Sequence, residues 1–588
     1  MAHKNDDSST NPSSTNSSSG GDAASGKHPA PFDEDAEEGA GLRGAWIVLF
    51  GLAALLLVAT RLWRLTDSCL WFDEIFSVHA ARYDLYAMLN FVAQDLIHPP
   101  LFYILLKAWM ASGGESLAWL RLFPALASVA TVVPFLLLCR ELRLKADETT
   151  LALALMALNG YLIKYAQEVR MYSLLLLLAF CSLWLFARYY NAHTNARKEL
   201  LALFAANLLL VYTHYFGWLL VASEFVFLLV FAARGKWRMF LIKTTALLVC
   251  FSPWVYAVLT RAANAGTGAG LRQNIGWMSR PGLRAVAQFY VTLQEILYYP
   301  QSNNEPLFQR WSAPLGLLLF VCPVVLLIIR HVLRRRAPFD TQTETHATEN
   351  AATLSTRHAE TPEIHRATTL SWLLLFSLLP SAFAFLASWF LPYSVWGARH
   401  LIIVAPSYLI VVAVALCRLR PVWLRTSMLV MLGCWTVASA SALAVRREGN
   451  YIWCAWETLA RRLPEAERAG GEPVSVYVFE DLVAYHAWFA LSRMEADGFR
   501  VEVVKGIDGL MEDPAYFLPR GFDEIATNSN GAEAFVDEHF WIAFRDTAWK
   551  PESQPLKMLR ERGYEIGQIF HVEAQGQKAF LVAVRRKK

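Results

Sequence analysis

The sequence is dominated by apolar runs of about twenty residues, separated by short polar or basic segments. An α-helix needs about twenty apolar residues to cross the hydrocarbon core of a bilayer, so each run predicts a membrane-spanning helix. A composition of 55% hydrophobic and only 18% charged residues excludes an ordinary soluble protein of 588 residues. The predicted spans lie at about 44–63, 119–139, 149–166, 171–189, 199–213, 215–233, 239–259, 313–332, 369–391, 400–417 and 422–444.

The basic residues between the runs predict the orientation of the chain. Alternating spans bring the basic clusters to one side only if the shorter apolar run at 99–112 does not cross the membrane. The positive-inside rule makes that side the cytoplasm. We therefore predict a juxtamembrane or re-entrant helix at 99–112, about eleven full spans, a cytoplasmic N-terminus and an extracytoplasmic C-terminus in a plasma (inner) membrane. The basic clusters lie at 140–145, 188–198, 234–238, 330–336 and 418–425.

The segments outside the spans differ in composition. Residues 1–42 are rich in Ser, Asn, Gly and acidic residues, and 337–367 are rich in Thr, His and Glu. Both have too few apolar residues for a folded core, so we predict disordered cytoplasmic segments. The transmembrane domain covers 43–445 and includes an outer loop at 64–118. Residues 446–588 alternate between strand-like and helix-like patterns, which predicts a soluble extracytoplasmic α/β domain.

The pattern of the soluble domain predicts substrate capture or scaffolding rather than catalysis, because it contains no glycine motif for binding nucleotides. Its predicted helices lie at about 456–463 and 481–495, and its strands near 474–479, 499–504, 540–544 and 578–585.

Eight cysteines are scattered without a CxxC pair, and most lie inside apolar runs. This distribution argues against a disulfide framework and against a zinc site built from cysteines. Cys69 and Cys454 both fall on the predicted outer side, where a disulfide between them is one option. The net charge of +4 says little about partners, and nothing in the sequence indicates nucleic acid.

Asp73 and Glu74 stand side by side in the outer loop, within Leu-Trp-Phe-Asp-Glu-Ile. Neighbouring residues on a helix point about 100° apart, so these carboxylates cannot flank one bond as the pair of a hydrolase does. One can act as a general base while the other holds a metal, a basic residue or the substrate. The alternative is the acidic start of an interfacial helix. The apolar surroundings favour function, because carboxylates at membrane depth are costly.

Two further polar segments face the outer side. His98 precedes two prolines, which form a rigid entry into a helix, and it is either a supporting residue or ligand, or a cap. A later turn contains Lys164, Glu168 and Arg170. Arg170 is a candidate phosphate clamp that Glu168 can position, because a guanidinium binds phosphate oxygens in pairs. An interfacial turn with snorkelling basic residues is the alternative.

Other polar residues lie at the ends or in the middle of predicted spans. His214-Tyr215 and Arg399-His400 are at the outer face, where an anionic headgroup or phosphate would be met, although anchoring in the aromatic belt explains Tyr215 equally well. Glu224 falls in the middle of a span, where it is either a structural hydrogen-bonding partner or part of a polar cavity.

Taken in order, these motifs resemble the GT-C glycosyltransferases. The most similar group is the family-39 type, which includes protein O-mannosyltransferases and lipid A aminoarabinose transferases. The resemblance rests on Asp-Glu after the first span, His-Pro-Pro-Leu, Gln-Glu-Val-Arg-Met-Tyr-Ser, Thr-His-Tyr, and Arg-His-Leu opening a late span. It covers about residues 44–445 and is strongest over 70–220.

The resemblance implies a membrane enzyme that transfers a sugar from a polyprenyl-phosphate donor to an extracytoplasmic lipid, glycan or protein acceptor, with inversion at the anomeric carbon. It also implies that Asp73 is the base for the acceptor hydroxyl and that Glu74 positions it or binds a cation. The donor phosphate would be held by Arg170, Lys164, Arg399 and His400. The supporting residues would be His98, Glu168, His214 and Tyr215.

The resemblance leaves the role of a metal open. No cofactor is certain, and a divalent ion, if one binds, would have Asp73, Glu74 and His98 as candidate ligands. The aminoarabinose transferases have Lys where this chain has His98, so neither their acceptor nor their metal site can be assumed. The loop Gly266–Gly270 is a candidate lid over the donor. Membrane lipids are the other expected partners.

Three alternatives stay open at this stage. A polymerase or ligase of surface polysaccharide belongs to the same chemical class. A transporter of lipid-linked sugars would predict an internal repeat and charges at the midplane, and we find no convincing repeat. A binding or scaffold protein would use the outer domain as a receptor and leave Asp73, Arg170 and Arg399 without a role.

Overall fold

The computed structural model describes residues 34–587 except 193–195, 232–233, 265–275, 277, 298–308, 337–361, 446–450, 465–472, 511–517 and 547–549. Within it, residues 49–588 form one compact unit. The predicted lid Gly266–Gly270 lies outside the described residues. So do most of the two predicted disordered segments, of which the described parts are the first turns of helices beginning at Glu34 and Pro362.

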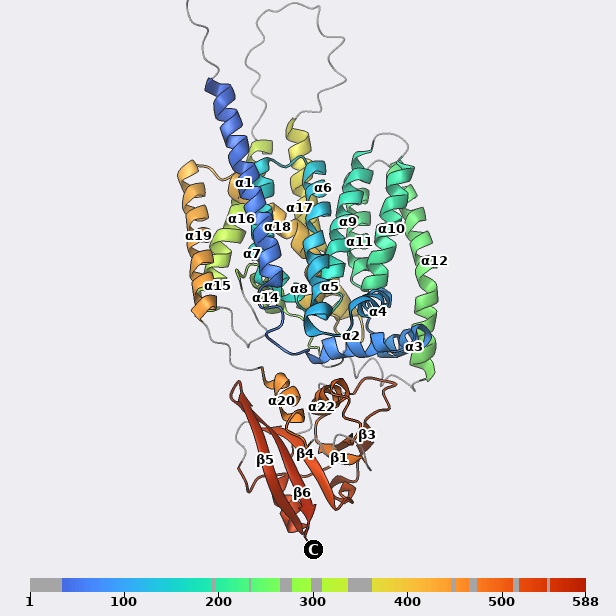
Figure 1. The fold of residues 1–588 in the computed structure, drawn as a ribbon. Helices are drawn as coiled ribbons and strands as arrows, with labels where there is room; N and C mark the ends of the chain where they lie inside the picture. The colour runs from blue at the N-terminus through green and yellow to red at the C-terminus, as the bar shows by residue number, and fades with distance from the viewer. Residues whose placement is uncertain are drawn as a thin grey trace, which may run out of the picture. The chain divides into compact units, whose positions relative to one another are not determined.

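The transmembrane region is a bundle of α-helices (Figure 1). Among the described residues, eight helices are long and apolar enough to cross a membrane, judged by length and composition. A polytopic membrane architecture is therefore confirmed, while the count of about eleven spans stays a prediction. The helices are α1 (Glu34–Leu62), α2 (Phe72–Arg82), α3 (Leu85–Asp95), α4 (Leu101–Gly113), α5 (Leu117–Ala130), α6 (Val132–Glu141), α7 (Ala146–Leu158), α8 (Gly160–Ala166), α9 (Tyr172–Asn191), α10 (Arg197–Thr213), α11 (Gly217–Phe231), α12 (Arg234–Asn264), α14 (Leu283–Thr292), α15 (Gln309–Gly316), η2 (Leu317–Val321), α16 (Cys322–Arg336), α17 (Pro362–Phe390), η3 (Ala398–Val404), α18 (Ala405–Cys417) and α19 (Val422–Val445).

Several predicted spans are not continuous α-helices. The run at 149–166 breaks at Asn159, whose side chain accepts a hydrogen bond from the Leu162 amide and donates one to the Leu293 carbonyl. The run at 400–417 begins with the 3-10 helix η3. Such irregular backbone is tolerated at membrane depth only where protein buries it and supplies the missing hydrogen bonds. The segment Ala398–Cys417 meets this condition, since 94% of its most apolar 18-residue window is buried.

A polar network lies inside the bundle, between α9, α10, α11 and α12. Glu224 accepts hydrogen bonds from Ser182 at 2.6 Å and from Asn207 at 2.8 Å, and its other partner is Lys243, with 3.8 Å between Nζ and Oε2. All four side chains are buried. The sequence leaves two roles open for Glu224, and the structural one agrees with this arrangement. Both oxygens of its carboxylate have partners, which are the Ser182 hydroxyl, the Asn207 amide and the Lys243 ammonium group.

The outer loop folds into α2, α3 and α4. In Figure 1, α2 and α3 run across the ends of the long helices, and the run predicted at 99–112 is the short helix α4. Asp84 caps α3 by accepting hydrogen bonds from the amides of Tyr86 and Ala87. The helix ends at Asp95, and the φ of 64° at the next residue, Leu96, turns the chain back, so that His98 lies beside Asp95.

The C-terminal region is an α/β domain built on a six-stranded mixed sheet, with strand order β3-β2-β1-β4-β6-β5. Strand β1 is parallel to β2 and β4, and β6 is antiparallel to β4 and β5. The elements are η4 (Ile452–Cys454), α20 (Ala455–Ala460), β1 (Val474–Val478), α22 (Asp481–Arg493), β2 (Phe499–Val504), β3 (Ala526–Asn528), η5 (Gly531–Ala534), β4 (His539–Asp546), α23 (Leu556–Glu561), β5 (Tyr564–Ala574) and β6 (Gln577–Arg586).

Alternation along the strands gives this sheet two apolar faces. Val476 and Val478 of β1 pack into the same core as α22 and the transmembrane helices, while Tyr477 between them packs with Phe540 and Phe535 on the other face. The predicted elements of this domain are confirmed. Sequence analysis missed β3, which is very short, and β5, most of whose residues are exposed or half-buried at the edge of the sheet.

The domain is joined to the outer loop by a covalent bond and by side-chain contacts. Cys69 forms a disulfide with Cys454, which was one option from the sequence. His79 on α2 lies between Tyr83 and Tyr485, with 2.9 Å from its Nδ1 to the Tyr485 hydroxyl. Arg82 donates a hydrogen bond to Ser492 on α22.

Candidate functional site

Asp73, at the start of α2, is paired with Arg399 at the start of η3. Nη1 of Arg399 donates a hydrogen bond of 2.7 Å to Oδ2 of Asp73, whose side chain is 22% exposed. Burial by itself raises the pKa of Asp73, but the charges of Arg399 and Arg170 outweigh it, so the pKa lies below its usual value. Asp73 is therefore ionised at neutral pH. The short loop before Arg399 requires glycine, since a Cβ at Gly397 would lie 2.6 Å from Nδ1 of His400.

Arg170 lies on the other side of Asp73 and is almost fully buried. Its Nη1 donates hydrogen bonds to the Asp73 carbonyl at 3.0 Å and to Ser77 Oγ at 3.1 Å, and its Nη2 lies 3.3 Å from His98 Nε2. A guanidinium can only donate, so Nε2 of His98 accepts, and Nδ1 carries the proton toward Asp95 at 3.3 Å. Hydrogen bonds thus link four side chains in a row, those of Ser77, Arg170, His98 and Asp95.

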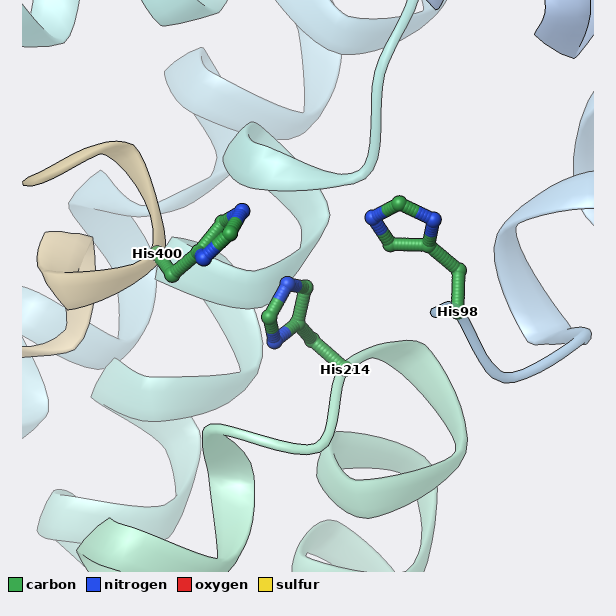
Figure 2. Close-up of side chains that lie close together, drawn as sticks. All are labelled: His98, His214 and His400. Carbon is green, nitrogen blue, oxygen red and sulfur yellow. The ribbon is translucent and has the colours of Figure 1, made fainter. Parts of the chain in front are cut away.

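His98, His214 and His400 form a buried cluster next to Arg170 (Figure 2). One ring nitrogen of each lies within 4.8 Å of the others, and in Figure 2 the three rings turn toward a common point. Burial and the nearby Arg170 lower the pKa of His98 and His214, so both imidazoles are neutral at pH 7. Within the described part of the chain, Nε2 of His214, Nε2 of His400, Nε of Arg170 and the hydroxyl of Tyr172 are buried without a hydrogen-bond partner.

The tautomers of this cluster favour an anion over a metal ion. The Phe216 amide donates to Nδ1 of His214 at 3.1 Å, so Nε2 of the neutral ring carries the proton and cannot ligate. The lone pair of His98 Nε2 already faces Arg170. The candidate metal set of Asp73, Glu74 and His98 does not fit either, because Arg399 and Arg121 occupy the two carboxylates. We refer to Arg170, His98, His214 and His400 as the basic cluster.

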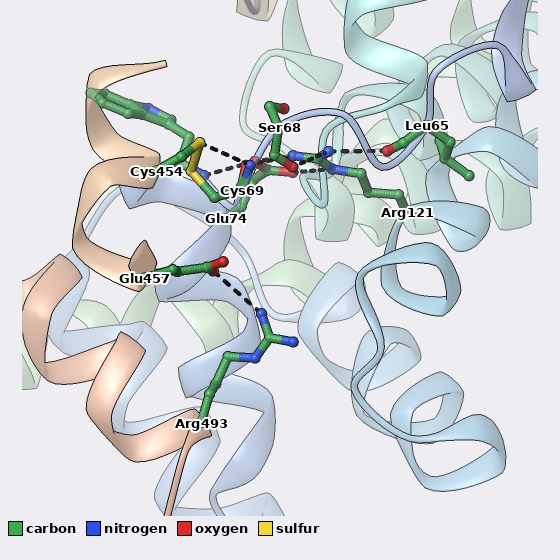
Figure 3. The surroundings of a disulfide bond; sticks show 9 residues. Leu65, Ser68, Cys69, Glu74, Arg121, Cys454, Glu457 and Arg493 are labelled. Atoms are coloured by element: carbon green, nitrogen blue, oxygen red, sulfur yellow. Dashed lines mark hydrogen bonds and ion pairs between the residues drawn. A yellow bond between two sulfur atoms is a disulfide. The ribbon is translucent and has the colours of Figure 1, made fainter. Parts of the chain in front are cut away.

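Glu74 is held in a buried ion pair with Arg121 (Figure 3). Its carboxylate accepts hydrogen bonds from the amides of Trp71 and Val169, both at 2.9 Å, and from Arg121. Arg121 also donates to three loop carbonyls, those of Leu65, Ser68 and Cys69. Glu74 therefore holds a basic residue, which is one of the roles that the sequence left open for it.

The remaining predicted residues lie apart from the basic cluster. Lys164 and Glu168 pair with each other at 3.8 Å, so Glu168 does not contact the Arg170 side chain that it was expected to position. The hydroxyl of Tyr215, in the turn before α11, accepts a hydrogen bond from Trp254 on α12.

Sequence analysis missed Arg121 and Asp95. The signal for Arg121 was a lone arginine inside the apolar run 119–139. Asp95 is three residues before His98, a spacing that only the turn at Leu96 converts into contact.

Comparisons with known proteins show a fold but no close relative. No protein-family model matches the chain, and no curated protein sequence matches it significantly. The crystal structure of ArnT from Cupriavidus metallidurans bound to undecaprenyl phosphate superposes with a TM-score of 0.54 at 14% identity, covering 92% of this chain and 98% of that one. ArnT from the same organism in the apo state gives 0.52 at 15% identity with the same coverage. The chain therefore has the ArnT fold, and the expected polytopic helical fold with a C-terminal α/β domain is confirmed.

Proposed function

We propose that the chain is a membrane glycosyltransferase that moves a sugar from a polyprenyl-phosphate donor to an extracytoplasmic acceptor, with inversion at the anomeric carbon. The observation that supports this most is the position of one ionised carboxylate, Asp73, between Arg399 and the buried basic cluster. The fold shared with ArnT, whose structure holds undecaprenyl phosphate, supports the same class of donor.

The reaction needs two kinds of charge, and the site offers both. The transition state at an anomeric carbon resembles an oxocarbenium ion, which a nearby carboxylate stabilises. Asp73 also accepts the proton of the acceptor hydroxyl as its oxygen bonds to the sugar and the bond to phosphate breaks. The released lipid phosphate gains negative charge, and the unpartnered N–H groups of Arg170 and His214 can bind it, with His400 beside them.

The location of the site follows from the substrate. A lipid-linked donor enters from the bilayer, so a site near the ends of the helices suits it. We place this end and the C-terminal domain on the extracytoplasmic side of a plasma membrane. The disulfide between Cys69 and Cys454 supports that side, because disulfides persist in oxidising compartments.

A polymerase or ligase of surface polysaccharide is the second candidate, since the same arrangement of Asp73 and the basic cluster suits any lipid-linked sugar donor. A transporter is less well supported, because Asp73, Arg170 and the three histidines meet at one site near the ends of helices.

The test is loss of sugar from a panel of labelled polyprenyl-phosphate sugars in membranes that contain the protein. We expect turnover of one donor that disappears in Asp73→Asn at unchanged expression. Asp67→Asn is the matched control, because Asp67 lies exposed in the same loop and pairs with Arg64, away from Asp73 in the sequence and from the residues of the site. Turnover that Asp73→Asn leaves intact would refute the assignment of this site.

A further inference from the structure

A cavity of about 250 Å³ lies beside Arg399, outside the basic cluster. Its walls come from the outer loop, from α8 and the turn after it, from the start of η3, and from the segment that enters the C-terminal domain. The lining residues that matter here are Trp71, Lys164, Tyr165, Glu168, Arg399 and Tyr451. Arg399 both lines the cavity and binds Asp73, so a molecule in the cavity lies against the partner of the proposed catalytic carboxylate.

The lining combines aromatic rings with charges of both signs. Lys164 lies 3.8 Å from Glu168 and 5.3 Å from the centre of the Tyr165 ring. A phosphate is disfavoured, because Glu168 offsets the charge of Lys164, and an acyl chain is disfavoured by the charged groups. A saccharide fits, since its C–H faces pack on aromatic rings and its hydroxyl groups bind both donors and acceptors.

The ionised residues of the back wall are already paired with each other. Glu74 and Arg121 also line the cavity, but each is occupied by the other and by backbone groups. The side chains of Lys164 and Glu168 are 30% and 16% exposed. They are therefore reachable from the cavity while remaining too buried to be ordinary surface residues.

The soluble domain contributes one wall. Tyr451 lies three residues before Cys454, whose disulfide to Cys69 joins it to the outer loop, and both Cys69 and Tyr451 line the cavity. The ring centroids of Trp71 and Tyr451 are 6.2 Å apart, so two of the aromatic residues lie next to each other across this junction. The covalent bond keeps the two walls together.

We propose that this cavity is a saccharide-binding subsite of the enzyme, separate from the basic cluster, with Lys164 and Glu168 as its polar specificity residues. The proposal rests on the proposed function and assigns Lys164 to sugar recognition instead of phosphate binding. The saccharide in this subsite is either the sugar of the donor or part of a glycan acceptor. The experiment below distinguishes the two.

The experiment measures binding without turnover. Lys164→Cys is treated with a membrane-impermeant anionic thiosulfonate, and its labelling rate is followed by mass spectrometry with wild type as background. Asp67→Cys, exposed in the same loop, is the control. Competitors are a panel of free neutral, amino and acidic sugars at up to about 100 mM, undecaprenyl phosphate, and intact undecaprenyl-phosphate sugars.

We expect at least one saccharide to slow labelling of Lys164→Cys several-fold without affecting Asp67→Cys, and undecaprenyl phosphate alone to have no effect. Protection by an intact donor, but not by free sugars when undecaprenyl phosphate is saturating, identifies the donor's sugar as the occupant. Protection by free sugars under that condition identifies the acceptor. Tyr451→Ala should weaken the protection in either case.

Because Lys164→Cys removes one of the proposed specificity residues, Ser68→Cys, which lines the same cavity, serves as a second reporter. Three results would overturn the subsite: no labelling of either variant, no protection of either variant by any saccharide, or equal protection by undecaprenyl phosphate alone. Protection combined with a failure to detect sugar transfer would leave the subsite standing and count against the proposed reaction. The two proposals therefore fail separately.

Discussion

Asp73 and Arg399 are joined by a hydrogen bond of 2.7 Å although 326 residues separate them in the sequence. The bond links the outer loop to the 3-10 segment that opens a late, almost fully buried span. The charge of Arg399 lowers the pKa of Asp73 and so keeps it ionised, and the hydrogen bond orients its carboxylate.

Replacing Arg399 by Gln should raise the pKa of Asp73, because Arg399 is the strongest influence that lowers it against the effect of burial. A base with a raised pKa becomes protonated at higher pH, so the acidic limb of the kcat/KM profile should move to higher pH. We also expect a loss of about 10²–10³-fold in kcat, typical of removing one electrostatic partner. A pH–rate profile with an unmoved acidic limb would contradict the role of the pair.

Asp95 should make phosphate binding depend on pH. Burial raises its pKa to about 7, although Arg170 and Arg520 lower it and Asp73 adds to the rise. Below pH 7 the carboxyl group of Asp95 is mostly neutral. Above pH 7 its negative charge offsets the positive charge of Arg170, which lies on the other side of His98. Affinity for undecaprenyl phosphate should therefore fall as pH rises from about 6 to 8, relative to Asp95→Asn. Comparing the two proteins removes the titration of the phosphate itself, and parallel profiles would argue against coupling.

Breaking the disulfide should destabilise the protein. A cross-link between Cys69 and Cys454 closes a loop of 385 residues, and such bonds typically contribute about 2–4 kcal/mol. We expect Cys454→Ser to lower the melting temperature in detergent by as much as reductant lowers that of the wild type. Cys434→Ser, at an exposed free cysteine, is the control. Insensitivity of the wild type to reductant would mean that the bond does not form.

Because Glu224 and Lys243 form an ion pair, the stability losses caused by replacing each of them should not be additive. Lys243→Met leaves a buried carboxylate without its cation and should cost about 3–5 kcal/mol. The double variant Glu224→Gln/Lys243→Met should recover most of that loss, because Gln still bonds Ser182 and Asn207. Thermal unfolding of the two single variants and the double variant measures the coupling. Additive losses would exclude a direct pairing.

Much of the architecture could be predicted from the sequence. Apolar runs of about twenty residues predict membrane-spanning helices, so the helical bundle was expected. The alternating pattern at Val474–Val478 predicts a β-strand, so a soluble domain with a sheet was expected as well. The breaks could not be foreseen. Asn159 interrupts a run that reads as one helix, and hydrogen bonds to Leu293 and to the residues that follow it, distant in sequence, stabilise this break.

The candidate site was likewise only partly predictable from the sequence. The sequence by itself determined which residue types were available, because Asp73, Arg170, Arg399 and the histidines stand out where charge is costly in a membrane. Their partners were decided by tertiary structure alone. Glu74 is adjacent to Asp73, yet it binds Arg121 in a buried pair while Asp73 meets Arg399. The reason is physical: two consecutive positions on a helix point in different directions, and the fold determines which cation each direction encounters.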